Sequence, residues 1–248
     1  MRTFNRIMTA SLMAIVAISS SSCYVRISKE AKEEIKQKLH MQQDMNEVVY
    51  SESDSLVISP GSFNALSSES SVDVTFIQSD CEPKVVIKGK YKSRDHIRVE
   101  NKDGNLNISY EENVFGIVIT HGEEVTVYAP GIESLSNRGS GDVLIKGTLE
   151  ACGFEILNIG SGDIEFEDAL LSGPLSMTNQ GSGDIEIDRC RIDGSLIIFN
   201  RGSGDITIKG NAGETTVTNQ GSGDVDISRL ETTSLEVTSK GSGDVIKR

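Results

Sequence analysis

The sequence predicts an all-β protein, a right-handed parallel β-solenoid with coils of about 20 residues, capped on its N-terminal side by a more irregular β region. Three observations predict this fold. Six near-copies of the motif N-X-G-S-G-D follow one another from residue 137 onward. Short runs of alternating apolar and polar residues flank each copy, as strands with one buried face require. The composition, with 24 Gly, 4 Pro, no Trp and 5% aromatic residues, is typical of a β-rich repeat protein.

Residues 1–22 are predicted to be a secretory signal peptide. Two arginines are followed by an apolar run over 7–18 and by small residues that end at Cys23. This run is too short and too unevenly apolar for a membrane span. Because four serines and then Cys23 resemble a bacterial lipoprotein lipobox, we expect lipidation of the Cys23 thiol and a durable membrane anchor. The alternative is ordinary signal cleavage near Ser22.

Residues 23–47 are predicted to be a polar, lipid-anchored tether. The segment is highly charged, and its few apolar positions include Ile35 and Leu39, four residues apart. A helix with so few apolar positions would be marginal, so we expect a spacer that does not pack.

Residues 48–248 are predicted to form the solenoid domain, with degenerate N-terminal coils over 48–133 and the repeats over 134–248. In the first part, alternating runs separated by polar or Gly-containing links predict strands and hairpins. The predicted strands are 71–76, 84–89, 97–100, 106–110 and 124–128, with the link KDGN at 102–105.

In the second part the motif aspartates recur every 19 to 21 residues. One alternating strand precedes each motif and another follows it, so each coil is expected to have two strands, a GSG corner and a looser return loop. The residues expected to point inward before the corner are Phe154, Ile156, Leu175, Met177, Leu196, Ile198, Val217, Leu235 and Val237. Those expected to point inward after it are Ile164, Phe166, Ile185, Ile187, Ile206, Ile208, Val225 and Ile227.

Each letter of the motif has a structural interpretation. Stacked asparagines can hydrogen-bond from coil to coil, which predicts a ladder of Asn137, Asn158, Asn179, Asn200 and Asn219, with Ser239 in the last place. The glycines permit positive φ in a tight corner and avoid collisions with neighbouring coils. Ser and Asp are expected to bond to nearby backbone N–H groups, as in an Asx turn.

The competing interpretation of the motif is a row of calcium ions. In-register aspartates would repeat about every 4.8 Å, and the row comprises Asp142, Asp163, Asp184, Asp205, Asp224 and Asp244. Their repulsion is tolerable in water, so an exposed row needs no ion, whereas a partly buried row would favour calcium. We expect an exposed corner and no cofactor, with calcium as the alternative.

Other chemistry is disfavoured by the sequence. The net charge of −13 argues against nucleic-acid partners. None of Cys81, Cys152 and Cys190 belongs to a CxxC pair, the spacing typical of metal and redox sites. His40, His96 and His121 are scattered, so no metal site is expected from them. No GxSxG, HExxH or P-loop motif is present, and we expect a protein that is not an enzyme.

Three stretches resemble the head GIN domain family of adhesin-like proteins. They are ISPGSFNALSSESSVDVTFIQSD (58–80), VTVYAPGIESLSNRGSGDVLIKG (125–147) and the GSGD array, so the resemblance covers about residues 56–248. It implies a β-solenoid exported by Gram-negative bacteria, often as a lipoprotein. It brings no catalytic or binding residues with it.

Taken together, these features predict an adhesin-like binding or structural module of the cell envelope, on the periplasmic or outer face of the outer membrane. The expected partners are the membrane, through the lipid, and a glycan or surface protein as ligand. The sequence stops inside its last motif, which leads us to expect an open strand edge that either is blunted by Lys247 and Arg248 or pairs with another copy. The alternatives are an envelope scaffold without an external ligand and a carbohydrate-active β-helix.

Overall fold

The computed structural model describes residues 55–89, 96–110 and 123–247. The chain divides into two units, residues 1–51 and 52–248, and the described residues all belong to the second. The predicted signal peptide, the lipidation site at Cys23 and the tether therefore lie outside the described residues. Across the three described ranges there is no helix, and so none that could span a membrane.

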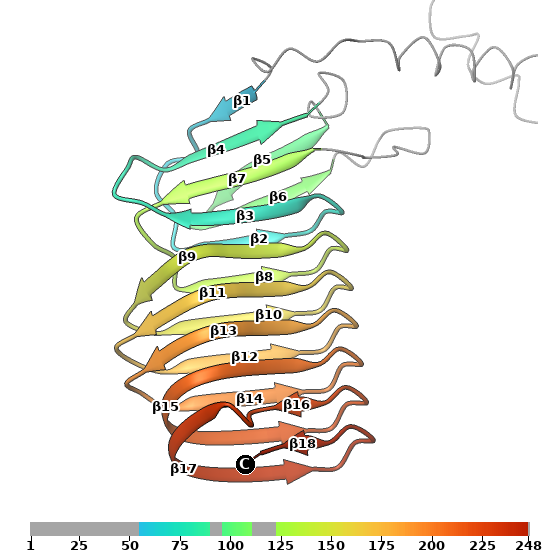
Figure 1. The fold of residues 1–248 in the computed structure, drawn as a ribbon. Coiled ribbons are helices and arrows are strands. Elements are labelled where there is room, and N and C mark those ends of the chain that lie inside the picture. Colours follow the sequence, from blue (N-terminus) through green and yellow to red (C-terminus); the bar gives the residue numbers. More distant parts are fainter. Residues whose placement is uncertain (1–54, 90–95, 111–122, 248) are drawn as a thin grey trace, which may run out of the picture. The chain divides into compact units, whose positions relative to one another are not determined.

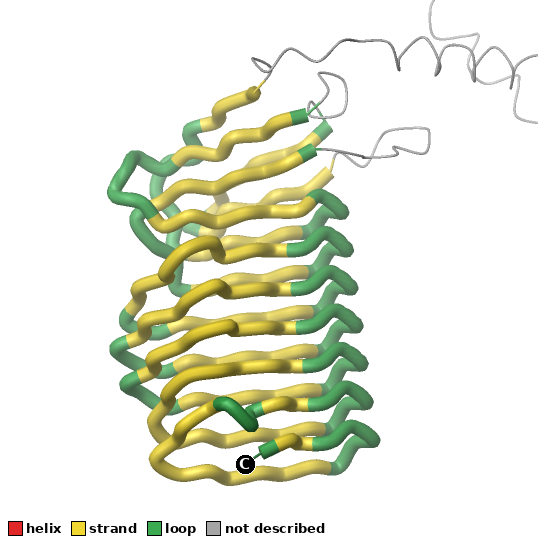
Figure 2. Tube along the Cα trace, viewed as in Figure 1, coloured by secondary structure: helices red, strands yellow, loops and turns green. Residues whose placement is uncertain are grey.

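The repeats form two stacks of parallel strands that meet at the GSGD corner (Figures 1 and 2). The first stack precedes each corner: β8 (Ser134–Asn137), β10 (Phe154–Asn158), β12 (Leu175–Asn179), β14 (Leu196–Asn200), the end of β15 (Ile206–Asn219), and β17 (Leu230–Ser239). The second follows each corner: β9 (Val143–Ala151), β11 (Ile164–Leu171), β13 (Ile185–Ile192), the start of β15, β16 (Val225–Asp226) and β18 (Val245–Ile246).

The register of the stacks repeats the motif from coil to coil. In the first stack Phe154 pairs with Leu175, which pairs with Leu196, and the asparagines that end these strands pair with one another. Equivalent side chains therefore lie directly above one another, with the same face buried in every coil. This arrangement confirms the predicted parallel β-solenoid.

The prediction of a loose loop that returns each coil to the next is wrong. The strands of the second stack continue past a register shift, which in β11 lies between Phe166 and Asp168, and their far parts form a third inward-facing segment. Its buried residues are Leu149, Ala169, Leu171, Cys190, Ile192, Ala212 and Leu230. In the coil that is shortened to 19 residues, β15 runs without interruption from one corner to the next.

The N-terminal part is irregular, as predicted, but it is not a series of successive coils. Its strands are β1 (Ser55–Ile58), β2 (Ala65–Ser68), β3 (Asp73–Gln78), β4 (Lys84–Lys88), β5 (Ile97–Lys102), β6 (Asn105–Tyr110) and β7 (Glu124–Ala129). Strand β2 pairs with both β6 and β8, and β3 pairs with both β7 and β9. The coil made by β2 and β3 thus lies between β6–β7 and the repeats, although β6 and β7 come later in the chain.

Antiparallel strands complete this end of the solenoid. Strand β4 pairs antiparallel with β1 and β7, and β5 with β6. The β5–β6 connection is the predicted hairpin, in which Asp103 and Gly104 adopt φ of 53° and 82°. Positive φ at both central residues is the signature of a type I′ turn, whose twist matches that of paired strands.

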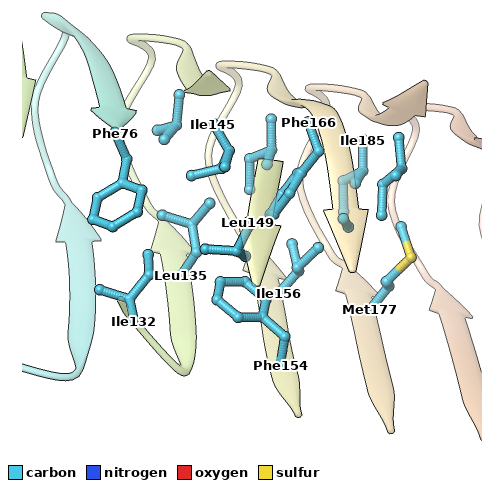
Figure 3. Close-up of a cluster of buried hydrophobic side chains, with 14 of the residues drawn as sticks. Phe76, Ile132, Leu135, Ile145, Leu149, Phe154, Ile156, Phe166, Met177 and Ile185 are labelled. Atoms are coloured by element: carbon cyan, nitrogen blue, oxygen red, sulfur yellow. The ribbon is translucent and has the colours of Figure 1, made fainter. Parts of the chain in front are cut away.

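The core is one continuous column of apolar side chains between the stacks (Figure 3). Phe154 and Phe166 contact edge to face with ring centroids 5.7 Å apart, which joins the two stacks within one coil. The residues predicted to point inward are buried, with the exception of Leu235 and Val237. Both of these lie on β17, and Leu235 is 38% exposed because no further strand of the described residues covers that edge.

Candidate functional site

The asparagines join each corner to the next one through the backbone. Asn179 is fully buried, and its Nδ2 donates to the carbonyl of Gly183 in its own corner at 3.0 Å and to that of Gly204 in the next corner at 3.2 Å. Its Oδ1 accepts the N–H of Gly181 at 3.1 Å. Asn137, Asn158 and Asn200 make the same pair of Nδ2 bonds, and none of the hydrogen bonds among the described asparagines links two of their side chains. The coils are thus connected by amide-to-carbonyl bonds.

The motif glycines are required by packing and not by positive φ. Positive φ occurs among the described glycines at five positions, all of them outside the GSGD motifs. A Cβ on Gly204 would overlap the carbonyl oxygen of Gly183 in the preceding coil, and one on Gly202 would overlap that of Gly181. The obstacle is backbone in both cases, so a side chain could be accommodated only by separating the coils.

The aspartates also join coils, which differs from the expected local turn. Oδ1 of Asp163 accepts the backbone N–H of Asp184 in the next coil at 2.7 Å. The same bond recurs between all neighbouring aspartates from Asp142 to Asp244. It also extends the row by one member, because Asp73 accepts the N–H of Asp142 at 3.0 Å. Sequence reasoning missed Asp73, although VDVTF (72–76) aligns with GDVLI (141–145).

The outward side of the corner is a regular polar surface. Three exposed rows run along it: the residue before each GSGD, the serine and the aspartate, with Asp224 half-buried. The residues before GSGD are Arg138, Ile159, Gln180, Arg201, Gln220 and Lys240. Among the described residues no ion pair neutralises the aspartate row, whose members are exposed apart from the half-buried Asp224.

The outer face of the second stack carries a compact charged cluster. Lys209 Nζ lies 2.7 Å from Glu186 Oε1 and 2.8 Å from Asp188 Oδ1 on the neighbouring strand. The hydrogen bond from Lys209 holds the pKa of Asp188 below its usual value, and the two carboxylates raise the pKa of Lys209. This cluster is a coil-to-coil contact in which one ammonium group bonds to two half-exposed carboxylates.

The described part of the chain has no group of His, Cys, Asp or Glu side chains arranged to hold a metal ion. Cys81, Cys152 and Cys190 are free thiols. Burial raises the pKa of the Cys190 thiol to about 11, so this cysteine behaves as a core residue.

A hollow of about 490 Å³ lies at the first corners of the stack. Arg138 and Ser140 from the first GSGD corner line it, together with Glu69 from the corner before and Ser161 from the corner after. Tyr110 and Ile159 add apolar surface. Sequence reasoning did not find this hollow, because its residues come from the end of β6, the corner after β2 and two repeats, which only the stacking order brings together.

A second hollow, of about 370 Å³, is lined by Phe63, by Cys81, and by the prolyl and acidic residues Asp80, Glu82, Pro83 and Pro130. It lies on the return side of the coil, away from the motif.

Comparison with known proteins places the fold. Residues 62–247 match the family model described as "Putative auto-transporter adhesin, head GIN domain". A "putative adhesin" from Bacteroides fragilis NCTC 9343 has a similar structure, with a TM-score of 0.61 and 18% identity, over 78% of this chain and 96% of that one. A "putative lipid binding protein" from Parabacteroides distasonis ATCC 8503 aligns with a TM-score of 0.48 and 19% identity, over 78% and 96% of the two chains.

No curated protein matches the sequence. At 18% identity the Bacteroides fragilis structure shows a shared fold and nothing of the ligand. The family model, in contrast, spans the GSGD array and most of the N-terminal cap. The chain therefore belongs to the head GIN domain family of adhesin-like proteins.

Proposed function

We propose that this chain is a non-enzymatic, adhesin-like binding module of the bacterial cell envelope. The observation that carries the proposal is the corner surface. Its glycines and asparagines, and the bonds from aspartate N–H groups to aspartate Oδ1 atoms, hold the stack together. Its serines, its aspartates and the residues before GSGD are exposed in rows along the outer side. A stacked surface that presents exposed polar groups at regular intervals is suited to binding a ligand.

The proposal extends to where the module acts. A secretory signal and lipidation of Cys23 would export the chain and anchor it to the outer membrane, with residues 23–47 as a tether between lipid and solenoid. Membership of an adhesin-like family supports export. The partners we propose are the membrane, through the lipid, and a glycan or surface protein at the corner surface, without nucleic acid or an obligatory metal.

The test is a binding array of glycans and matrix proteins probed with the full chain, once with EDTA and once with calcium. The proposal predicts binding to at least one array member that survives EDTA. Release of new reducing ends from any glycan would contradict the non-enzymatic assignment. Absence of binding on the whole array, together with protection of the protein from protease added to intact cells, would instead indicate an internal scaffold.

A further inference from the structure

The sequence NRGSGD occurs twice, at 137–142 and 200–205, and its two arginines have different surroundings. The guanidinium of Arg201 lies over the ring of Phe199, 4.5 Å from the centroid, and its Nε donates to Gln220 Oε1 at 3.4 Å. Both contacts are unavailable to Arg138. Ser136 stands where the other copy has Phe199, and Ile159 stands in the next coil where the other copy has Gln220.

Arg138 is consequently an exposed cation whose side chain makes no hydrogen bond or ion pair with the described residues. It is also the arginine that lines the hollow. The carboxylate of Glu69 lines the same hollow and is held on one side by a hydrogen bond from Asn107 Nδ2 to its Oε2 at 3.3 Å. One hollow therefore combines a free guanidinium with an oriented carboxylate.

The remaining lining suits a ligand rich in hydroxyl groups. Ser140 and Ser161 are exposed hydroxyls that can both donate and accept, and Ile159, 39% exposed, offers an apolar surface beside them. The hollow is shallow and largely open to solvent, so a bound molecule would contact the protein through one of its faces. Guanidinium N–H groups donate to two neighbouring oxygens, and a carboxylate accepts from two neighbouring hydroxyls.

The electrostatics select against an anion. Glu69 lies in the hollow itself, Asp142 ends the same corner that carries Arg138 and Ser140, and the chain carries a net charge of −13. An acidic ligand would meet one cation and a surrounding negative field, whereas a neutral ligand meets no such penalty.

We propose that the hollow at Arg138 and Glu69 binds a neutral sugar through its vicinal hydroxyl groups. This inference rests on the proposed binding function and names the site and the ligand class. It assigns different roles to two copies of one motif: the arginine at 138 is a ligand-binding residue, and the arginine at 201 is a packing residue.

Saturation-transfer difference NMR on the full chain tests this proposal, with methyl glycosides of neutral hexoses and N-acetylhexosamines as probes and glucuronic acid as the acidic comparison. Arg138→Gln and Glu69→Gln are the test variants, and Arg201→Gln is the matched control in the same motif. At least one neutral sugar should bind, and each test variant should raise its Kd roughly tenfold or more, since hydrogen bonds to charged groups are lost. The control should bind like the unmodified chain.

Equal effects of Arg138→Gln and Arg201→Gln, or stronger binding of glucuronic acid than of neutral sugars, would overturn the proposal. So would the absence of a signal from every neutral sugar, even if the array finds a protein ligand, in which case the binding function stands and the sugar site falls. Unchanged circular dichroism and melting temperature of the variants establish that a loss of binding is not a loss of fold, which is expected because both arginines are exposed.

Discussion

The backbone N–H of Asp224 donates to Oδ1 of Asp205 in the preceding coil, 2.7 Å away. The N–H of Asp205 is bonded in the same way to Asp184. Each carboxylate thus satisfies a backbone donor that the corner would otherwise leave without a partner. This explains why aspartate is repeated here although carboxylates about 4.8 Å apart repel by about 1 kcal/mol in water.

Replacement of Asp205 by Asn should therefore be mild, because the amide oxygen can still accept the N–H of Asp224 while one charge leaves the row. We expect the free energy of unfolding to change by less than about 0.5 kcal/mol. Asp205→Ala, which removes the acceptor, should cost about 1 kcal/mol or more. Urea unfolding followed by circular dichroism, with EDTA and with millimolar calcium, measures both. A large calcium-dependent stability that Asp205→Asn abolishes would support the calcium row instead.

Replacement of the buried Asn179 by Ala should be severe. The change removes three hydrogen bonds and leaves the carbonyls of Gly183 and Gly204 without their amide donor. We expect a loss of about 2–4 kcal/mol in the free energy of unfolding. Thr178→Ala is the control, since this neighbour points outward from the same strand and is only half-buried. Equal losses in the two variants would show that the asparagine bonds contribute little.

The Lys209 cluster should stabilise the fold between about pH 5 and pH 9 and lose its effect in acid. The lowered pKa of Asp188 means that its contribution is present above its unfolded pKa and disappears as the pH falls through the folded one. The raised pKa of Lys209 means that its contribution persists until the pH rises past the usual lysine value.

The urea unfolding midpoints of Lys209→Met and of the unmodified chain, measured across this pH range, show whether the stabilisation by the cluster falls in acid. The difference in unfolding midpoint should be small, constant near neutrality, and smaller as the pH falls below the usual aspartate pKa of about 4 toward the lowered pKa of Asp188. A difference that grows on acidification would contradict the assignment.

Two of the cysteines should react with alkylating reagents at different rates, because their thiols differ in burial. Cys152 is exposed, whereas Cys190 is buried and has a pKa near 11. At pH 8, iodoacetamide should label Cys152 in the native protein within minutes and leave Cys190 unmodified until urea is added. Peptide mass spectrometry distinguishes the two sites. Rapid native labelling of Cys190 would show that the third segment of its coil opens.

The repeats could be predicted from the sequence because each coil copies the same local signals. Alternation placed Ile156, Met177 and Ile198 in the core, and the period placed the corners above one another. The third inward segment was missed because Ala169 and Leu171 follow a register shift that breaks the period-2 pattern. Inward positions separated by a bulge do not alternate in the sequence.

The stacking order and the hollow depend on long-range pairing, which no local signal reports. Strand β2 lies between β6 and β8, and this order alone brings Glu69, Tyr110 and Arg138 to one place. The role of the glycines was likewise predicted only in part. The expected contact with the neighbouring coil is present, but the expected positive φ is absent from the motif.

The GSGD motif is the corner of one stacked body, with its glycines packed against the preceding coil and its serines exposed. The most direct test compares the urea unfolding midpoints of Gly204→Ala and Ser203→Ala, adjacent positions in one motif. The Cβ at 204 would overlap the Gly183 carbonyl, whereas the Ser203 side chain is exposed. We predict that Gly204→Ala lowers the free energy of unfolding by about 3 kcal/mol or more and that Ser203→Ala changes it by less than about 0.5 kcal/mol. Equal stability of the two variants would contradict the claim.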